Sequence, residues 1–236
     1  MTSGQRGTGA IEPVIQESTP SMIASRIREA IASGAIPPGS QIGEEQYARQ
    51  LAVSRGPLRE GLQRLAQEGL LTARRNRGHF VIEMTRENVE DMYVARAAVE
   101  RAAAALIHRR DPKAAAEIML VIVADMDRAA KRGDEAGVSD ADIRFHRALV
   151  AASGSPRLQR IQETLMTETR MCIHALEPTY AVGGTRVAEH RRIARSFTGG
   201  DPDKTDKLLS AHMEDAITRL VAGPPAATPT ADGRTG

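Results

Sequence analysis

The spacing of the apolar residues restricts the fold of this 236-residue chain more than any other feature. Leu58, Leu62 and Leu65 recur at the intervals of one helical face, and similar intervals run through most of the sequence. Aromatic residues make up only 3% of the chain and tryptophan is absent, so the composition favours helices over a β-sandwich. We therefore expect a mostly α-helical protein.

The two ends of the chain lack this periodicity. Residues 1–17 and 223–236 are rich in Gly, Thr and Pro, and such segments bury too little apolar surface to fold. We expect both segments to be disordered tails. Between them the pattern changes near Glu83, which predicts two domains, residues 18–83 and residues 84–222.

Residues 18–83 carry the start and stop signals of three short helices, followed by two short strands. The first helix has Thr19 as its predicted N-cap and Pro20 as its first helical residue. The second helix covers about residues 44–52, and the third begins after Ser54, its predicted N-cap. The β-prone segments on either side of "RRNRG" predict a hairpin. Three helices and a hairpin make a winged helix-turn-helix.

Four arginines occupy the parts of this motif that would face nucleic acid. Arg55 and Arg59 are four residues apart on the helix face opposite the leucines, and arginine pairs with guanine O6 and N7 in the major groove. Arg75 and Arg77 at the hairpin tip suit phosphates or the minor groove. Two arginines alone would be an ordinary solvent-exposed pair. The neighbouring helices, and ten arginines without a lysine in the first 82 residues, favour DNA binding.

The same segment resembles a known family. Residues 33–81, "SGAIPPGSQIGEEQYARQLAVSRGPLREGLQRLAQEGLLTARRNRGHFV", contain a PG turn, a "VSRxPLRExLxRLxxEGL" helix and an "RGxxV" wing. These motifs resemble the DNA-binding domain of GntR-family transcriptional regulators. The DNA-contacting residues that the resemblance implies are Ser54, Arg55, Arg59, Arg75, Arg77 and Gly78.

From residue 84 onward the sequence consists of amphipathic helical segments separated by short polar breaks. The predicted helices cover residues 87–109, 112–132, 137–152, 156–177, 185–197 and 202–222. We expect them to form an antiparallel six-helix bundle. The residues predicted in its core include Val94, Ala98, Leu106, Ile118, Val121, Leu149 and His174, whereas His108 is predicted at the surface.

Four residues in this half have the chemistry of metal ligands. Asp142 and His146 are four residues apart on one predicted helix, and His190 and His212 come from the last two helices. Three imidazoles and one carboxylate suit Zn, Ni, Co, Fe or Mn. Each histidine by itself is a common core or surface residue, and Asp142 with His146 is also a possible helix-surface pair. The combination of all four predicts a divalent metal site.

The second half also resembles a known domain. Residues 96–220 contain "RxxxE" in the first helix, "DxxFH" in the third, "EH" in the fifth and a histidine in the last. This pattern is similar to the FCD effector domain of FadR-subfamily regulators. The resemblance implies that Asp142, His146, His190 and His212 bind a divalent metal beneath a small carboxylate effector. It also implies that Arg96, the helix partner of Glu100, faces the effector pocket.

These patterns together predict a transcriptional regulator rather than an enzyme. We expect a homodimer that binds an inverted-repeat operator in double-stranded DNA, because two recognition helices related by two-fold symmetry require a two-fold site. A small organic acid at the metal would control operator affinity. Two alternatives remain open at this point: a metal-dependent enzyme, and a DNA-binding regulator whose metal is purely structural.

The remaining features concern the compartment. Cys172 is the one cysteine, so no intramolecular disulfide can form. The N-terminal residues lack the order of a signal peptide, and no apolar run reaches the roughly 20 residues that span a bilayer. We expect a cytoplasmic protein that does not bind a membrane.

Overall fold

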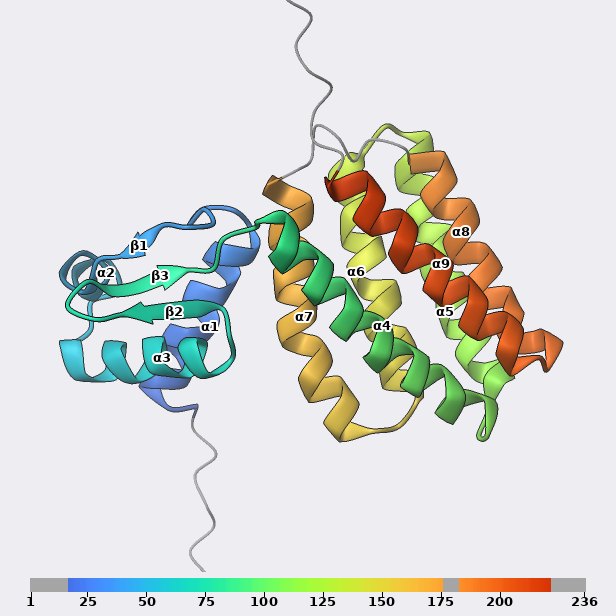
Figure 1. Cartoon of the computed structure of the whole chain (residues 1–236), viewed down its shortest axis with the longest axis horizontal. Helices are drawn as coiled ribbons and strands as arrows, with labels where there is room; N and C mark the ends of the chain where they lie inside the picture. The colour runs from blue at the N-terminus through green and yellow to red at the C-terminus, as the bar shows by residue number, and fades with distance from the viewer. Residues whose placement is uncertain (1–16, 176–182, 222–236) are drawn as a thin grey trace, which may run out of the picture.

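A computed structural model describes residues 17–175 and 183–221, and these residues form two parts that lie side by side (Figure 1). The N-terminal part is a winged helix-turn-helix, as predicted. Its elements are α1 (Thr19–Ala32), β1 (Gln41–Ile42), α2 (Glu44–Gln50), α3 (Arg55–Gln67), β2 (Leu71–Arg74) and β3 (Gly78–Val81).

The C-terminal part is a bundle of helices, which confirms the predicted mostly α fold. Its helices are α4 (Arg86–His108), α5 (Pro112–Lys131), α6 (Glu135–Ala152), α7 (Pro156–Ala175), α8 (Gly183–Ser196) and α9 (Pro202–Val221), with a 3₁₀ turn at Phe197–Gly199. The predicted helices agree with these bounds to within two residues wherever the chain is described. The predicted tails lie outside the described residues, apart from Glu17. None of the helices in the described ranges is both long and apolar enough to cross a membrane.

Helix α3 lies directly against α1. Its three leucines are fully buried in the N-terminal core. Gly61 allows the close approach, because a Cβ at this position would lie 2.9 Å from Ile23 Cγ2 and 3.1 Å from the Pro20 carbonyl oxygen. The predicted N-cap of α1 was wrong by one residue. Ser18 takes that position, and its hydroxyl accepts a hydrogen bond from the backbone N–H of Ser21.

The wing is a small antiparallel sheet with the strand order β1-β3-β2. The predicted hairpin is confirmed, with Arg74 paired to Gly78 across the turn. Asn76 and Gly78 in this turn have φ values of 59° and 81°, a conformation that Asn and Gly adopt more readily than other residues. Strand β1 was not predicted, because two residues are too few to show an alternating pattern.

The predicted core positions of the bundle were mostly wrong. Of the six apolar residues, Leu149 is fully buried and Leu106 is half-buried, whereas Val94, Ala98, Ile118 and Val121 are exposed. In α4 the reason is that the buried face includes two charged residues, Arg96 and Glu100. A face assigned from apolar residues alone is therefore rotated away from the true one.

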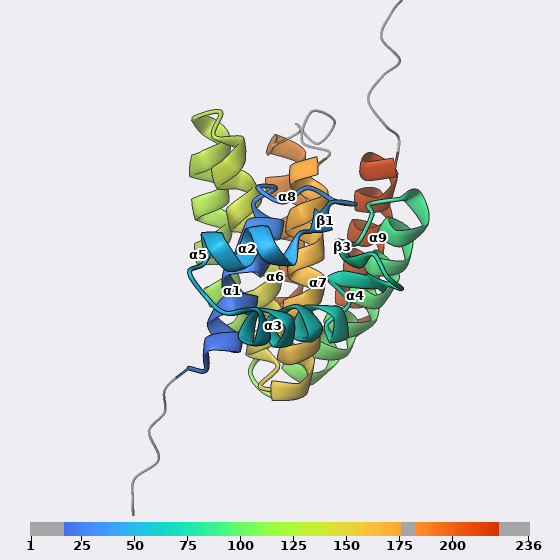
Figure 2. The ribbon, with the colours of Figure 1, turned by 90° about the vertical axis from the view of Figure 1, so that its left-hand side faces the viewer.

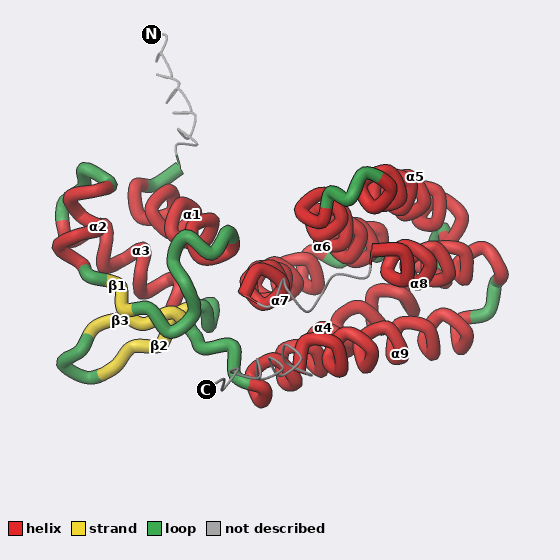
Figure 3. The backbone as a smooth tube through the Cα atoms, turned by 90° about the horizontal axis from the view of Figure 1, so that it is seen from above, coloured by secondary structure: helices red, strands yellow, loops and turns green. Residues whose placement is uncertain are grey.

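Helix α7 joins the two parts of the molecule (Figure 3). Met171 belongs to the core of the N-terminal part, whereas its neighbours Cys172 and Ile173 belong to the core of the bundle. His174, predicted in the core, is instead exposed. His108, predicted at the surface, is half-buried, and its Nε2 lies 2.9 Å from Thr205 Oγ1.

Candidate metal centre and nucleic-acid interface

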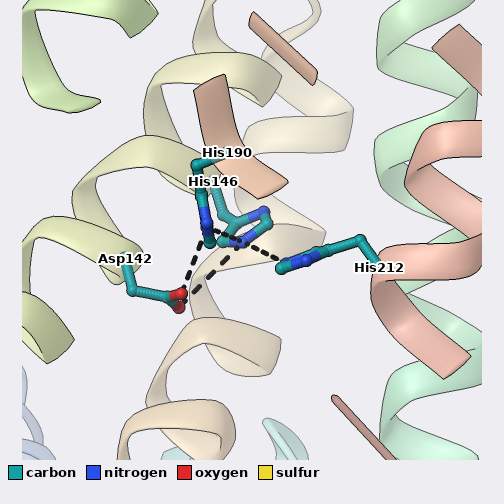
Figure 4. Close-up of side chains that lie close together, drawn as sticks. All are labelled: Asp142, His146, His190 and His212. Atoms are coloured by element: carbon teal, nitrogen blue, oxygen red, sulfur yellow. Dashed lines mark hydrogen bonds and ion pairs between the residues drawn. The ribbon is translucent and has the colours of Figure 1, made fainter. Parts of the chain in front are cut away.

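The four predicted metal ligands meet inside the bundle (Figure 4). Asp142 and His146 come from successive turns of α6, His190 from α8 and His212 from α9. All four side chains are buried, and one possible ligand atom from each lies within 4.8 Å of the others. Three helices far apart in sequence therefore place the predicted donors around one point.

The imidazole nitrogens approach one another closely at this point. His146 Nε2 lies 3.2 Å from the Nε2 of His190 and 3.2 Å from that of His212. The Asp142 carboxylate lies 3.1 Å from His190 Nε2 and 4.0 Å from His146 Nε2. Nitrogens that bind one zinc ion at about 2.0–2.1 Å are separated by about 3 Å, so these spacings match a shared ion.

Acceptors outside the cluster determine which nitrogen of each ring carries the hydrogen. His146 Nδ1 lies 2.7 Å from Glu100 Oε2, His190 Nδ1 lies 2.8 Å from a backbone carbonyl in α8, and His212 Nδ1 lies 3.2 Å from Glu189 Oε2. A carboxylate or carbonyl can only accept, so each Nδ1–H donates and each Nε2 keeps its lone pair. Outer carboxylates and carbonyls hold metal-binding histidines in this way.

The ionisation of these groups favours cation binding. Burial raises the pKa of Glu100, but the attraction and hydrogen bonds of His146 and Arg96 hold that pKa at about 2. Burial also raises the pKa of Asp142, yet His190 brings it well below its usual range. Burial lowers the pKa of His212 to about 4 despite the opposing effect of Glu189. At neutral pH the site therefore offers an ionised carboxylate and a neutral His212 imidazole.

This donor set fits a divalent metal ion. Three Nε2 lone pairs directed at one point repel each other, and a cation at that point removes the repulsion. Nitrogen and carboxylate donors in this ratio suit Zn, Ni, Co, Fe or Mn.

Arg96 lies behind this cluster rather than at the surface. Its side chain is 1% exposed, and its Nε donates a 2.9 Å hydrogen bond to Glu100 Oε1. The same carboxylate oxygen accepts from Gln162 Nε2 at 3.1 Å. Arg96 Nη1 reaches Thr169 Oγ1 at 3.5 Å, whereas Nη2 is buried with no hydrogen-bond partner among the residues that the structure describes. Arg96 is therefore a buried residue, and one of its donors is available inside the bundle.

The predicted DNA-reading arginines lie at the opposite end of the molecule. Helices α2 and α3 face away from the bundle (Figure 2). Arg55 begins α3 and Arg59 follows one turn later, with side chains 63% and 64% exposed. Arg59 Nε donates to Glu44 Oε2 at 2.7 Å, and Arg55 Nη2 lies 3.8 Å from Glu45 Oε2. Ser54 is the N-cap of α3, as predicted, although its side chain makes no capping hydrogen bond.

The predicted wing residues are also accessible. Arg75, Arg77 and Gly78 are exposed at the hairpin tip. Arg74, the preceding residue, lies over the ring of Phe80 at 4.4 Å. The tip and α3 therefore present two separate groups of arginines to solvent.

Comparison with known proteins agrees with both parts of the fold. Residues 19–81 match the model of bacterial regulatory proteins of the gntR family, and residues 91–215 match that of the FCD domain. The chain is 30% identical over 199 residues to the "Probable D-xylose utilization operon transcriptional repressor" of Paenarthrobacter nicotinovorans, covering 83% of this chain and 87% of the relative. The chain is a GntR-family transcriptional regulator with an FCD domain.

Further similarities agree with this assignment of the GntR regulator. It is 32% identical over 190 residues to the "Nta operon transcriptional regulator" of Aminobacter aminovorans, covering 79% of this chain and 88% of that one. Among solved structures, a transcriptional regulator GntR from Rhodococcus sp. RHA1 superposes with a TM-score of 0.73 at 26% identity, covering 89% of this chain and all of that one. The family and these relatives are DNA-binding transcriptional regulators and not enzymes.

Three residues around the candidate metal site of this GntR regulator were not predicted from sequence. Gln162 has no motif that marks it, and its contact with Glu100 depends on the packing of α7 against α4. Arg186 supplies the carbonyl that accepts from His190, and any residue type supplies a carbonyl. Glu189 precedes His190 in the "EH" motif, so the sequence contained a signal for this residue. Its carboxylate, however, contacts His212, which lies on another helix.

Proposed function

We propose that this GntR regulator controls its operator affinity through a small carboxylate bound at a divalent-metal centre. The metal ligands are Asp142, His146, His190 and His212. The observation that carries the proposal is the convergence of three buried Nε2 atoms, two of them 3.2 Å from the third, beside an ionised carboxylate. When bound, the ion supplies positive charge and a position for a carboxylate oxygen.

The chain's own residues support an effector beside this centre. Glu100 fixes the His146 ring, and Arg96 and Gln162 in turn hold Glu100. Arg96 Nη2 is buried without a partner in the described part of the chain, and a buried donor that makes no hydrogen bond costs free energy. A carboxylate oxygen of the effector would satisfy it through a charge-assisted hydrogen bond. Arg96 is therefore our proposed effector-binding residue.

On the DNA side, the proposal places α3 in the major groove and the wing against the backbone. The proposed DNA-contacting residues are Ser54, Arg55, Arg59, Arg75, Arg77 and Gly78. Their exposure on the face turned away from the bundle supports this assignment. We propose that a homodimer binds an inverted repeat, that residues 18–83 and 84–222 are its two domains, and that it acts in the cytoplasm on its operator.

Helix α7 is a physical link between the proposed effector site and the N-terminal domain. Gln162 and Thr169 face the Arg96–Glu100 pair on one side of the helix, and Met171 is part of the N-terminal core on another. A ligand that changes the position of Arg96 would therefore act on a helix that both domains share. Such a ligand shifts DNA binding only by its preference for one arrangement.

The test measures operator affinity of the full-length protein with a panel of hydroxy-, keto- and dicarboxylic acids. Metal-loaded protein, chelated protein and the His190→Ala variant are compared. We expect at least one acid to change operator affinity fivefold or more in the loaded protein and not in the other two. An acid that acts equally on the chelated protein would contradict the metal-dependent mechanism.

A regulator with a purely structural metal is the second candidate, because four protein ligands are enough for a closed site. Under that model, the loaded protein binds metal and DNA but responds to none of the acids. Arg96→Lys separates the two models. It keeps the positive charge beside Glu100 but removes the planar donors, so it should weaken the acid response without releasing the metal.

A further inference from the structure

Glu45 places a negative charge on the surface that reads DNA. It lies in the first turn of α2 and is 66% exposed. Its Oε2 is 3.8 Å from the Arg55 guanidinium, and its Oε1 is 3.6 Å from Arg49 Nη1. Arg55 is the first residue of α3, and the N-terminal residues of a recognition helix are those that contact base edges. Glu45 is therefore beside the base-reading end of the helix.

Few groups in DNA can accept a carboxylate at the position of Glu45 as a neighbour. Phosphates surround the groove with negative charge, so an unpaired carboxylate opposes binding. The hydrogen-bond donors in the major groove are the amino groups N4 of cytosine and N6 of adenine, and carboxylates accept characteristically from cytosine N4. Guanine and thymine present acceptors or a methyl group at the corresponding places. The sequence next to Arg55 therefore decides whether Glu45 favours or opposes the complex.

The spacing of the two side chains agrees with readout of neighbouring base pairs. Successive bases rise by about 3.4 Å, close to the 3.8 Å between the Arg55 and Glu45 end groups. If Arg55 contacts guanine N7 and O6, Glu45 is therefore close enough for its carboxylate to reach the neighbouring base pair.

We propose that Glu45 is a specificity-determining residue that accepts a hydrogen bond from cytosine N4 beside the guanine read by Arg55. The proposal rests on the DNA-reading role given to Arg55 above. In the free protein, Glu45 forms ion pairs with Arg49 and Arg55. Because these pairs are exposed, replacing them with contacts to DNA costs little free energy. On a sequence without the amino group, Glu45 is left beside phosphates and acceptors. It therefore rejects incorrect sites.

The test is binding-site selection by the full-length protein from a pool of randomised DNA duplexes. We expect the wild type to select cytosine at one position in each half-site. Glu45→Ala should reduce that preference by tenfold or more while leaving the other positions unchanged. Glu45→Gln should shift the preference toward adenine, because glutamine pairs with adenine N6 and N7. Glu29→Gln removes the same charge from an exposed position of α1 and should leave the selected sequence unchanged.

Two further measurements distinguish a failure of the Glu45 proposal from a failure of the function proposed above. Both Glu45 variants should bind non-specific duplex several-fold more tightly at low salt, because one opposing charge is gone. If they gain that affinity but select the wild-type sequence, Glu45 only screens charge and the proposal is overturned. Arg55→Ala should abolish the guanine preference. If it does not, the DNA-reading role of α3 has failed as well.

Discussion

Helix α4 contains two Arg–Glu pairs with the same spacing in two different regions. Arg86 and Glu90 in its first turns are 2.8 Å apart, with side chains 74% and 41% exposed. Arg96 and Glu100 in its middle are 2.9 Å apart and almost completely buried. The i, i+4 spacing and the order along the helix are the same, so the pairs differ in burial and in the further partners that the buried pair contacts.

Buried ion pairs keep their partners, whereas exposed ion pairs can exchange one partner for another. A buried charge that loses its partner remains without water, whereas an exposed charge is resolvated. The same contrast holds between the two sites of the molecule. Glu100 has three protein partners beside the candidate metal site, whereas Arg59 and Glu44 form an exposed pair at 2.7 Å. The candidate metal site is therefore surrounded by fixed pairs, whereas the arginines proposed to contact DNA form exposed pairs that DNA can replace.

The largest expected effect comes from breaking the buried pair. Arg96→Met should lower the free energy of unfolding by about 3–5 kcal/mol, because Glu100 is left buried without its cation. Arg86→Met is the matched control in the same helix and should cost less than about 0.5 kcal/mol. Urea unfolding of both variants measures the difference. Equal losses would show that burial does not distinguish the pairs.

The second-largest effect is expected on DNA affinity, when the exposed arginines that we propose contact DNA are replaced. Arg55→Ala should weaken binding to the selected operator by about 1–3 kcal/mol through loss of base contacts. Arg75→Ala at the wing tip should weaken all duplexes to a similar degree and make the salt dependence less steep. Titrations at several salt concentrations distinguish the two. Unchanged operator affinity in an Arg55→Ala, Arg59→Ala double variant with an intact fold would exclude the assignment.

Glu168 in α7 is an intermediate case, because its side chain is half-buried and lies near another acid. Burial and the charge of Asp91 raise its pKa to about 7. Because the folded state holds this proton more tightly than the unfolded state, stability should fall as the pH rises from about 4.5 to about 7. Glu168→Gln should therefore stabilise the protein by about 1–2 kcal/mol at pH 8 and have little effect at pH 5.

Unfolding midpoints at the two pH values test this sign. Glu163→Gln, at an exposed position of the same helix, should show no such pH dependence. A Glu168→Gln variant that gains no stability at pH 8 would contradict the raised pKa.

The smallest expected effect comes from the exposed pair between α2 and α3. Glu44→Gln removes the partner of Arg59 and should change the free energy of unfolding by less than about 1 kcal/mol. Thermal unfolding measures it. A loss similar to that of Arg96→Met would show that this pair is fixed in the same way as the buried one.

The local signals in the sequence predicted most of the fold. Turn residues and caps placed the helix ends closely, because they act on the backbone within a few residues. The rotation of the bundle helices was harder to predict. Val94 and Val121 are exposed, while Arg96 and Glu100 take core positions. Which face a helix buries depends on partners from distant segments, and here those partners are charged.

The candidate metal site was predictable for a different reason. Its ligands have distinctive chemistry, so the residue types together with the resemblance identified Asp142 and the three histidines before any contact was known. Their supports were harder to find. Gln162 is an ordinary polar residue until α7 places its amide beside Glu100. The tautomers of the three rings likewise depend on contacts that only the fold creates.

We expect Asp142, His146, His190 and His212 to form one metal centre. Titration of chelator-treated, full-length protein with Co²⁺, followed by absorption and calorimetry, tests it directly. We expect one ion per chain and ligand-field bands typical of nitrogen and oxygen donors. His190→Ala and His212→Ala should both lose this binding, whereas His174→Ala, at an exposed position, should keep it. No stoichiometric uptake by the wild type, or equal uptake by all three variants, would contradict the claim.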